Sequence, residues 1–420
     1  MDPSTEAGRR PLTICAIGSS ASAHVVNRVR CFVERGHRVY LISEARAGID
    51  GVTEVVPSEA RGQDLPLVKV LNALALRCFR RPFPHRALLG LLLDFLSILK
   101  QCQPDIVHVH YAYSGWAWMA VVAARHPLVV SIMGGDVLFE EQGSPTPRGR
   151  WLTRELLRAA DLITSKSTFL IGVLDGLGGF GAKAIRVVWG VDLKRFRKVD
   201  ADALRASLGL SRDQPVILSP KILRPLYNVH LLIEAMPDIV AACPGATLLV
   251  TEYGADPHYR QAMAARIQQL GLGARVKFVG HIPQEDMPRY YSLADVSAAV
   301  PSSDGLPQTL LEGMACEVPN ILSRLPRYEE VVSHEESAYF VDIEPRAIAR
   351  GVIRILRDAE LRDRLVRRAA DIVAVEGDFE ADVARVEAEY YRLLAGPRRR
   401  TGYATRVRVL WQVVKYWTGS

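Results

Sequence analysis

The chain has 420 residues, of which 49% are hydrophobic and 24% charged, and its formal net charge is +7. A chain of this length and composition is typical of a globular protein with two domains and excludes one that is largely disordered. Basic residues outnumber acidic ones before residue 200 and after residue 396. This favours an anionic partner, such as a phospholipid surface or a phosphorylated acceptor, and no nucleic-acid-binding motif accompanies it.

The six cysteines are scattered along the chain without a Cys-x2-Cys pair. The pattern argues against a disulfide scaffold and a structural zinc site, and it fits a reducing compartment. The first residues are polar and unlike a signal peptide, and the longest apolar run, residues 87–99, is interrupted by Asp94 and too short to span a bilayer. We therefore expect a cytoplasmic protein, with a peripheral position on the inner face of the plasma membrane as one option.

The first half alternates between apolar strand patterns and helical patterns. Strands are predicted at 11–17, 39–43, 105–110, 127–133, 161–165 and 185–192, and helices at 24–35, 67–99 with a break at 82–84, and 152–160. Gly18 and Ser19 form a loop at the carboxyl end of the first strand, the usual ligand edge of a parallel sheet, but without the Gly-x-Gly-x-x-Gly spacing.

Two histidines, His108 and His110, share one face of the strand predicted at 105–110 because side chains alternate along a strand. No carboxylate or cysteine neighbour completes a metal site, so His110, at the strand's carboxyl end, is better interpreted as a polar contact in a cleft. A loop is predicted at 134–136.

Two stretches combine basic and apolar residues. The first, 67–99, contains Lys69, Arg77, Arg80, Arg81 and Arg86, and the second, the tail, contains Arg398, Arg399, Arg400, Arg406, Arg408, Trp411, Lys415 and Trp417. Either stretch is suited to an anionic membrane surface. The alternatives are that the first packs its apolar face on the sheet, and that the tail packs back over the N-terminal domain or frays.

The strand–helix pattern restarts after a boundary near residues 192–208. Strands are predicted at 215–219, 247–252, 276–280 and 294–301, helices at 229–242, 257–270, 283–294, 345–374 and 381–394, and mixed structure at 323–343. Two consecutive doubly wound α/β domains imply a cleft between the carboxyl edges of their sheets.

After the strand predicted at 294–301, the stretch from Asp304 to Glu312 predicts a glycine turn and a helix N-terminus. Backbone N–H groups and the helix dipole at such a turn favour a phosphate. Glu312, expected about two turns into the helix, is suited to the two hydroxyls of a ribose. The structural alternative is an ordinary turn, which any α/β protein contains.

In this order, the segments resemble the retaining GT-B glycosyltransferases of the large group 1, family 4-like class that includes bacterial mannosyl- and polysaccharide glycosyltransferases. The resemblance covers about residues 11–395, and Asp304 and Glu312 match the class's Glu-x7-Glu motif with Asp in first place. Six further segments match: Gly18-Ser19 with His24, Val107–His110, Gly134–Asp136, Gly190–Asp192 with Phe196, Phe278–His281, and Ala294-Asp295.

The resemblance implies an α/β GT-B fold of two Rossmann-like domains facing a cleft. Residues 1–200 would bind the acceptor and residues 201–395 the sugar-nucleotide donor, with the last helix packing back toward the first domain and a basic tail at 396–420. It also implies a retaining, metal-independent hexosyltransferase without a cofactor, using a UDP- or GDP-sugar and a lipid-linked, polysaccharide or phosphorylated acceptor.

The resemblance also implies roles for individual residues. His110, Asp136 and Asp304 would contact the donor sugar, with Asp304 at its hydroxyls. Lys221 and Arg224 would contact the diphosphate, as would Gly305 and the backbone amides of Gln308, Thr309 and Leu310. Glu312 would bind the ribose, His281 and Ile282 the base, and Gly18, Ser19 and His24 would lie on the acceptor side. The class usually places an Arg and a Lys where this chain has Ile222 and Tyr227, so Lys221 and Arg224 would act from displaced positions. A sugar-nucleotide epimerase and a non-catalytic sugar-nucleotide-binding protein stay open as alternatives, and the sequence does not specify the sugar, base, acceptor or oligomeric state.

Overall fold

The computed structural model describes residues 10–58, 61, 64, 66–79, 86–123, 127–139, 146–397 and 400–418. The chain divides into two compact units. Unit 1 comprises Met1–Ser165, Leu170–Val187 and Val383–Ser420, and unit 2 comprises Lys166–Phe169 and Val188–Asp382. The main divisions between the two units lie after Val187 and after Asp382. The second division lies inside helix α17 (Phe379–Ala395).

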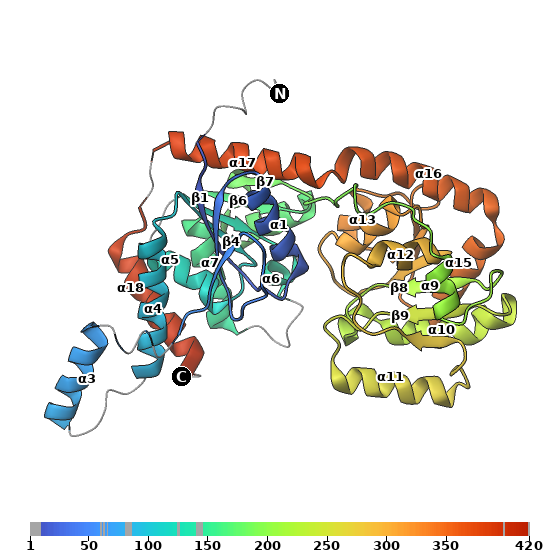
Figure 1. The fold of residues 1–420 in the computed structure, drawn as a ribbon, viewed down its shortest axis with the longest axis horizontal. Helices are drawn as coiled ribbons and strands as arrows, with labels where there is room; N and C mark the ends of the chain where they lie inside the picture. Colours follow the sequence, from blue (N-terminus) through green and yellow to red (C-terminus); the bar gives the residue numbers. More distant parts are fainter. Residues whose placement is uncertain are drawn as a thin grey trace. The chain divides into compact units, whose positions relative to one another are not determined.

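Unit 1 is built on a seven-stranded parallel sheet with the strand order β3-β2-β1-β4-β5-β6-β7 (Figure 1). Its strands are β1 (Thr13–Ile17), β2 (Arg38–Ile42), β3 (Thr53–Val55), β4 (Ile106–His110), β5 (Leu128–Ser131), β6 (Leu162–Ser165) and β7 (Ala184–Arg186). The central strands are apolar and buried, as expected for a parallel sheet that is covered on both faces.

The helices that begin in this half of the chain are α1 (Ala23–Glu34), α3 (Pro66–Phe79), α4 (Arg86–Cys102), α5 (Gly115–Ala123), α6 (Gly135–Leu138), α7 (Pro147–Ala159) and α8 (Thr168–Gly178). The sequence did not predict α5, α8 or strand β3. The sequence of α5, GWAWMAVVA, is apolar all round and most of the helix is buried, so it lacks the one-sided pattern from which a helix is predicted.

Unit 2 contains a six-stranded parallel sheet in the order β10-β9-β8-β11-β12-β13. Its strands are β8 (Val216–Ser219), β9 (Thr247–Val250), β10 (Val276–Phe278), β11 (Val296–Ala299), β12 (Asn320–Ser323) and β13 (Tyr339–Val341). Its helices are α9 (Asp202–Ser207), α10 (Val229–Ala242), α11 (Pro257–Gln269), α12 (Met287–Leu293), α13 (Gln308–Ala315), α14 (Pro326–Glu329), α15 (Pro345–Arg357) and α16 (Ala359–Glu376).

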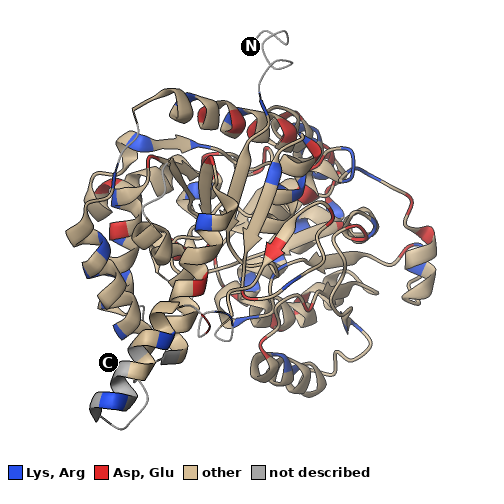
Figure 2. Ribbon diagram, turned by 60° about the vertical axis from the view of Figure 1, so that its left-hand side comes forward, with Lys and Arg blue, Asp and Glu red and all other residues tan. Residues whose placement is uncertain are grey.

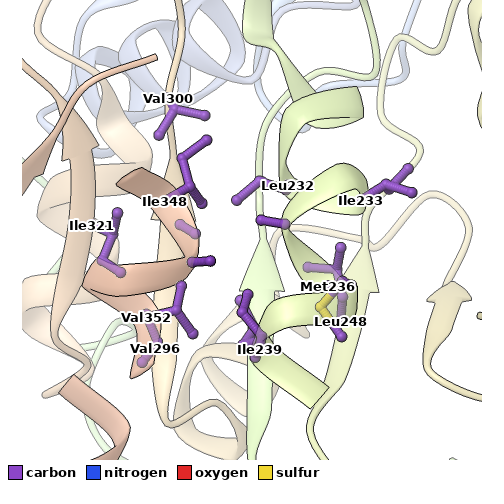
Figure 3. Close-up of a cluster of buried hydrophobic side chains, with 14 of the residues drawn as sticks. Leu232, Ile233, Met236, Ile239, Leu248, Val296, Val300, Ile321, Ile348 and Val352 are labelled. Carbon is purple, nitrogen blue, oxygen red and sulfur yellow. The ribbon is translucent and has the colours of Figure 1, made fainter. Parts of the chain in front are cut away.

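One core of unit 2 lies where α10 and α15 pack side by side over the sheet (Figure 3). Leu232 and Met236 of α10 meet Ile348 and Val352 of α15 over strand residues such as Val296, and all of them are buried. Burying one such side chain contributes about 1.5–3 kcal/mol, so this packing fixes the strands that carry the loops described below.

Several predicted features differ from the structure. The strand predicted at 185–192 ends at Arg186, the loop at 134–136 includes the start of α6, and helix 345–374 is divided into α15 and α16 at Asp358. The Asp358 side chain accepts a hydrogen bond from the Leu361 amide at 3.0 Å and so caps α16. Glu312 is the fifth residue of α13, about one turn from its start rather than two.

The predicted break at 82–84 and the basic residues Arg80, Arg81, Arg398 and Arg399 lie outside the described residues. Helix α4 buries Leu92, Phe95 and Leu99 and packs on β1 and α5. In this part of the stretch 67–99 the apolar face therefore packs against the sheet, which was the alternative to a membrane contact. In the part of the chain that the structure describes, no helix is both long and apolar enough to cross a membrane.

Candidate functional site

Each sheet has one position where the strand order reverses, and ligands of doubly wound sheets bind beside this position. In unit 2 it lies between β8 and β11, and in unit 1 between β1 and β4. The segments that follow β8, β11 and β1 contain Lys221, Asp304 and Gly18, and His110 is the last residue of β4. The topology therefore places these predicted residues at the ligand edge of each unit.

Lys221, after β8, forms an ion pair with Asp304, after β11. The two side chains are only 7% and 14% exposed, so the pair is largely shielded from water. The Tyr328 hydroxyl donates to the same carboxylate oxygen, Oδ2, at 3.0 Å, and the Lys221 ammonium lies 5.1 Å from the centre of the Tyr227 ring. Within the described part of the chain, Asp304 Oδ1 has no hydrogen-bond donor.

Glu312 is buried in α13, and its Oε2 accepts a hydrogen bond of 2.9 Å from the Tyr291 hydroxyl. Burial raises the pKa of the Glu312 carboxyl, although Tyr291 and Gln284 hydrogen bonds and the nearby Lys221 and Lys166 charges oppose the rise. Burial and the Glu312 charge hold the pKa of Tyr291 well above its usual value, so the phenol keeps its proton and donates it.

The start of α13 is fixed from several directions. The side-chain amide of Gln308 donates to the Gly190 carbonyl, and the Lys166 ammonium donates to the Leu306 carbonyl at 3.2 Å. Pro307 is the N-cap residue of α13. The Leu310 amide donates to the Pro307 carbonyl at 3.2 Å, and its contact with a phosphate stays a prediction.

The remaining predicted residues of unit 2 lie around this edge without joining the Lys221–Asp304 pair. Arg224 is exposed, and its Nε donates to the Gly254 carbonyl at 3.1 Å. His281 is exposed and its ring centre lies 5.5 Å from that of Tyr253, whereas Ile282 and Gly305 are buried. Of the two displaced cations, the structure thus brings Lys221 to the carboxylate and not Arg224.

In unit 1, His110 ends β4 and is buried beside the Gly18 loop. A Cβ atom on Gly18 would lie 3.2 Å from His110 Cβ and 3.2 Å from Val25 Cγ2, so only glycine fits here without movement of its neighbours. An Arg28 guanidinium nitrogen lies 3.3 Å from His110 Nδ1. Because arginine only donates, Nδ1 must accept, and the neutral ring then carries its proton on Nε2.

His108 lies beside His110, with ring centres 4.1 Å apart, and is held from both sides. Its Nδ1 contacts the Tyr390 hydroxyl of α17, and its Nε2 lies 2.8 Å from the Ser131 hydroxyl. Burial lowers the pKa of both histidines well below the usual value, and the Arg28 charge lowers them further. Both rings are therefore neutral at physiological pH.

Asp136 is fully buried at the start of α6. Its Oδ2 accepts from the Ala112 amide at 2.7 Å, and its Oδ1 from the Met133 and Gly134 amides at 2.9 and 3.0 Å. Burial raises the pKa of the carboxyl, while these backbone hydrogen bonds oppose the rise. The side chain therefore ties the loop after β4 to the loop after β5.

Ser19 and His24 lie at opposite ends of the turn between β1 and α1. The Ser19 hydroxyl donates to Glu44, which follows β2, and the Ser20 hydroxyl donates to the Ala45 carbonyl at 2.9 Å. His24 is the second residue of α1 and is partly buried. The loop predicted to contact the acceptor is thus anchored to the neighbouring strand.

Sequence reasoning missed five residues of these networks: Arg28, Lys166, Tyr291, Tyr328 and Tyr390. Each is distant in sequence from the residue it contacts, and none belongs to a recognisable motif. Across the residues that the structure describes, no three His, Cys, Asp or Glu side chains gather as they would to hold a metal ion.

Two family models match the chain. The model described as "Glycosyltransferase Family 4" matches residues 21–195, and the one described as "Glycosyl transferases group 1" matches residues 200–371. Among curated relatives, the N-acetyl-alpha-D-glucosaminyl L-malate synthase of Bacillus anthracis is 27% identical over 69% of this chain and 75% of its own length. The D-inositol 3-phosphate glycosyltransferase of Segniliparus rotundus is 26% identical over 71% of this chain and 70% of its own.

Solved structures of similar fold include Anabaena HepE in complex with UDP and glucose, which is 17% identical, with a TM-score of 0.75, over 91% of this chain and all of that one. The sucrose-phosphate synthase of Thermosynechococcus elongatus is 22% identical, with a TM-score of 0.74, over 92% of this chain and all of that one. The two Rossmann-like units and these neighbours confirm the predicted α/β GT-B fold. The family models, the relatives and the fold agree, and the chain belongs to the group 1, family 4-like glycosyltransferases.

Proposed function

We propose that this glycosyltransferase is a retaining, metal-independent hexosyltransferase that takes its sugar from a UDP- or GDP-sugar. The observation that carries the proposal is the arrangement of Lys221, Asp304 and Glu312 around the start of α13, where the strand order of unit 2 reverses. A cation, a helix N-terminus and two carboxylates at one ligand edge suit a diphosphate that is bonded to a ribose and a sugar.

In this proposal Lys221 and the amides of Gln308 and Thr309 stabilise the charge of the leaving diphosphate. Preorganised donors of this kind lower the barrier because they need no rearrangement as the charge develops. The Thr309 hydroxyl oxygen is buried and has no hydrogen-bond partner in the described structure, so it is a further donor for a phosphate oxygen. Glu312, oriented by Tyr291, accepts the ribose hydroxyls.

Asp304 binds a hydroxyl of the transferred sugar through Oδ1, because Lys221 and Tyr328 already occupy Oδ2. The transfer is proposed to be dissociative and to occur on one face of the sugar. The glycosidic bond to the diphosphate breaks, the acceptor oxygen bonds to the anomeric carbon, and a leaving phosphate oxygen takes the acceptor proton. No side chain is required to form a covalent intermediate.

In unit 1, we propose that His110 donates a hydrogen bond from Nε2–H to a sugar hydroxyl. Nε2 carries the ring proton because Nδ1 accepts from Arg28. Asp136 acts as a positioning residue, because backbone amides already occupy both of its oxygens. Gly18 and Ser19, with the neighbouring His24, would form the acceptor side of unit 1. The buried, neutral state of His110 supports hydrogen bonding rather than proton transfer at physiological pH.

The acceptor class that we propose is a lipid-linked, polysaccharide or phosphorylated acceptor, with the enzyme peripheral at an anionic membrane. The basic excess of the first 200 residues and the tail supports an anionic acceptor. The name of the Segniliparus relative, an inositol 3-phosphate glycosyltransferase, supports the phosphorylated option, and the UDP and glucose in the Anabaena neighbour support a UDP-sugar donor.

A thermal-shift panel with UDP, GDP and ADP tests the donor, because a bound ligand raises the melting temperature by mass action. We expect one of the first two to stabilise the protein and Glu312→Ala to abolish this shift. Radiolabelled sugar nucleotide with membrane lipid extract then tests transfer, and Arg368→Gln on α16 is the matched surface control. Equal binding of nucleotide by Glu312→Ala would contradict the site, and label that stays on the nucleotide with an altered sugar would indicate an epimerase instead.

A further inference from the structure

Helix α18 (Tyr403–Thr418) has two apolar faces. One face packs against the described helices of unit 1, and the other is exposed to solvent. On its inner face Val409 and Val413 are completely buried against α5 and α7 (Figure 1). Trp417 packs edge-on against Trp116, with ring centres 5.2 Å apart, and the absence of a side chain at Gly115 allows this approach. The tail is therefore a docked helix rather than a frayed end.

The outer face of α18 presents large apolar side chains to solvent. Tyr403, Val407 and Trp411 are 78%, 49% and 58% exposed, although most large apolar residues of the chain are buried. They are spaced four residues apart, so they form one stripe along about two turns of the helix. A Lys415 ammonium lies 5.0 Å from the centre of the Trp411 ring at the end of this stripe.

Within helices α18 and α7 the exposed charged residues are all basic. On α7, Arg150, Arg154 and Arg158 are exposed and also spaced four residues apart, and the Arg408 guanidinium of α18 lies 5.1 Å from the centre of the Trp151 ring of α7. Figure 2 marks the Lys and Arg positions of the ribbon in blue and the Asp and Glu positions in red. The only acidic residue of the two helices is Glu155. It is buried, and it pairs with Arg158 and at 3.7 Å with Arg408, so it adds little negative charge to the surface.

We infer that the exposed faces of α18 and α7 form a docking surface for an anionic lipid bilayer. The docking surface consists of Tyr403, Val407 and Trp411 with Arg150, Arg154, Arg158 and Arg408. Tyrosine and tryptophan favour the boundary between acyl chains and headgroups, and arginines beside them attract anionic headgroups. A nucleic acid would match the arginines but not an aliphatic and aromatic stripe at the same surface.

The inference specifies the membrane contact of the proposed function, and it does not depend on the donor site in unit 2. Each exposed arginine near an anionic surface contributes about 1 kcal/mol, which is about a fivefold change in affinity. Replacing Arg150 and Arg154 by glutamine is therefore expected to weaken vesicle binding about twenty-fivefold. Both side chains are exposed, so the fold should persist.

Sedimentation with vesicles of equal parts phosphatidylglycerol and phosphatidylcholine tests the surface, with phosphatidylcholine vesicles as the neutral reference. We expect the full chain to bind the anionic vesicles only, and Val407→Ser with Trp411→Ser to weaken binding at least tenfold. Val375→Ser and Arg368→Gln are the matched controls, because both residues are exposed on α16 in unit 2, and they should bind as the parent does.

The inference is overturned if the parent does not bind anionic vesicles, or if the docking-surface variants bind them equally well. It is also overturned if Trp411→Ser abolishes self-association in gel filtration without changing vesicle binding, or if an oligonucleotide binds as tightly as the vesicles do. The nucleotide-induced thermal shift is measured on the same proteins. If that shift is absent while vesicle binding persists, the proposed donor chemistry fails and the docking surface stands.

Discussion

The ion pair between Lys221 and Asp304 provides a quantitative test of the donor site, because its two partners are shielded and its removal has a calculable effect. Taking one partner from a buried ion pair costs about 3–5 kcal/mol of folding free energy when the other charge is left uncompensated. Asp304 is 14% exposed and keeps a hydrogen bond from Tyr328. We therefore expect Lys221→Met to destabilise the protein by about 2–3 kcal/mol, at or below the lower end of that range.

A double-mutant cycle separates the pair from its surroundings. Lys221→Met, Asp304→Asn and the double variant are compared with the parent by urea unfolding followed by circular dichroism. The double variant leaves neither charge unpaired. Its loss of unfolding free energy should therefore be smaller than the sum of the losses in the two single variants by about 1.5 kcal/mol or more. Lys198→Met is the control, because the ammonium of this exposed lysine of unit 2 donates to the Ser292 carbonyl at 3.2 Å rather than to a carboxylate, and the substitution should change stability by less than about 0.5 kcal/mol.

Additivity of the two single variants within about 0.5 kcal/mol would refute the inference that this pair is a strong, shielded interaction. The same variants also test function. Lys221→Met should lose most of the nucleoside diphosphate thermal shift, because its ammonium is the cation placed at the ligand edge of β8. An unchanged shift would remove Lys221 from the diphosphate site even if the stability cycle behaves as expected.

Tyr291→Phe should weaken nucleoside diphosphate binding about tenfold in calorimetry, because Glu312 loses the hydrogen bond that orients it, and unchanged affinity would exclude a positioning role. Folding stability should decline as the pH falls below about 6.5, because His108 and His110 have lowered pKa values and the unfolded chain binds the additional protons. His108→Asn should make this decline shallower in urea unfolding at several pH values, and an unaltered slope would show that the buried ring does not cause it. Asp136→Ala should destabilise the protein by about 2–4 kcal/mol, since buried amides lose their acceptor, and a loss under 1 kcal/mol would contradict its role in fixing the loops.

The sequence by itself determined the alternation of strands and helices and hence the fold class. Strong apolar runs such as those of β1 and β4, and the one-sided helix α10, agree with their predicted positions to within about two residues. It also determined which loops follow the strands at the ligand edge, because a parallel sheet places all the carboxyl ends together. The stretch from Asp304 to Glu312 was recognisable for that reason and for its resemblance to a known motif.

Only the tertiary structure decided which side chains meet. Lys221 and Arg224 are three residues apart and both carry a positive charge, so local sequence does not distinguish them, yet only Lys221 of the two reaches Asp304. The partners of Glu312 and His108, Tyr291 and Tyr390, come from distant helices and lack any local signal. The tail shows the same principle: its sequence is amphipathic all along, and the packing of Val409 and Val413 on α5 and α7 is what leaves the stripe with Trp411 exposed.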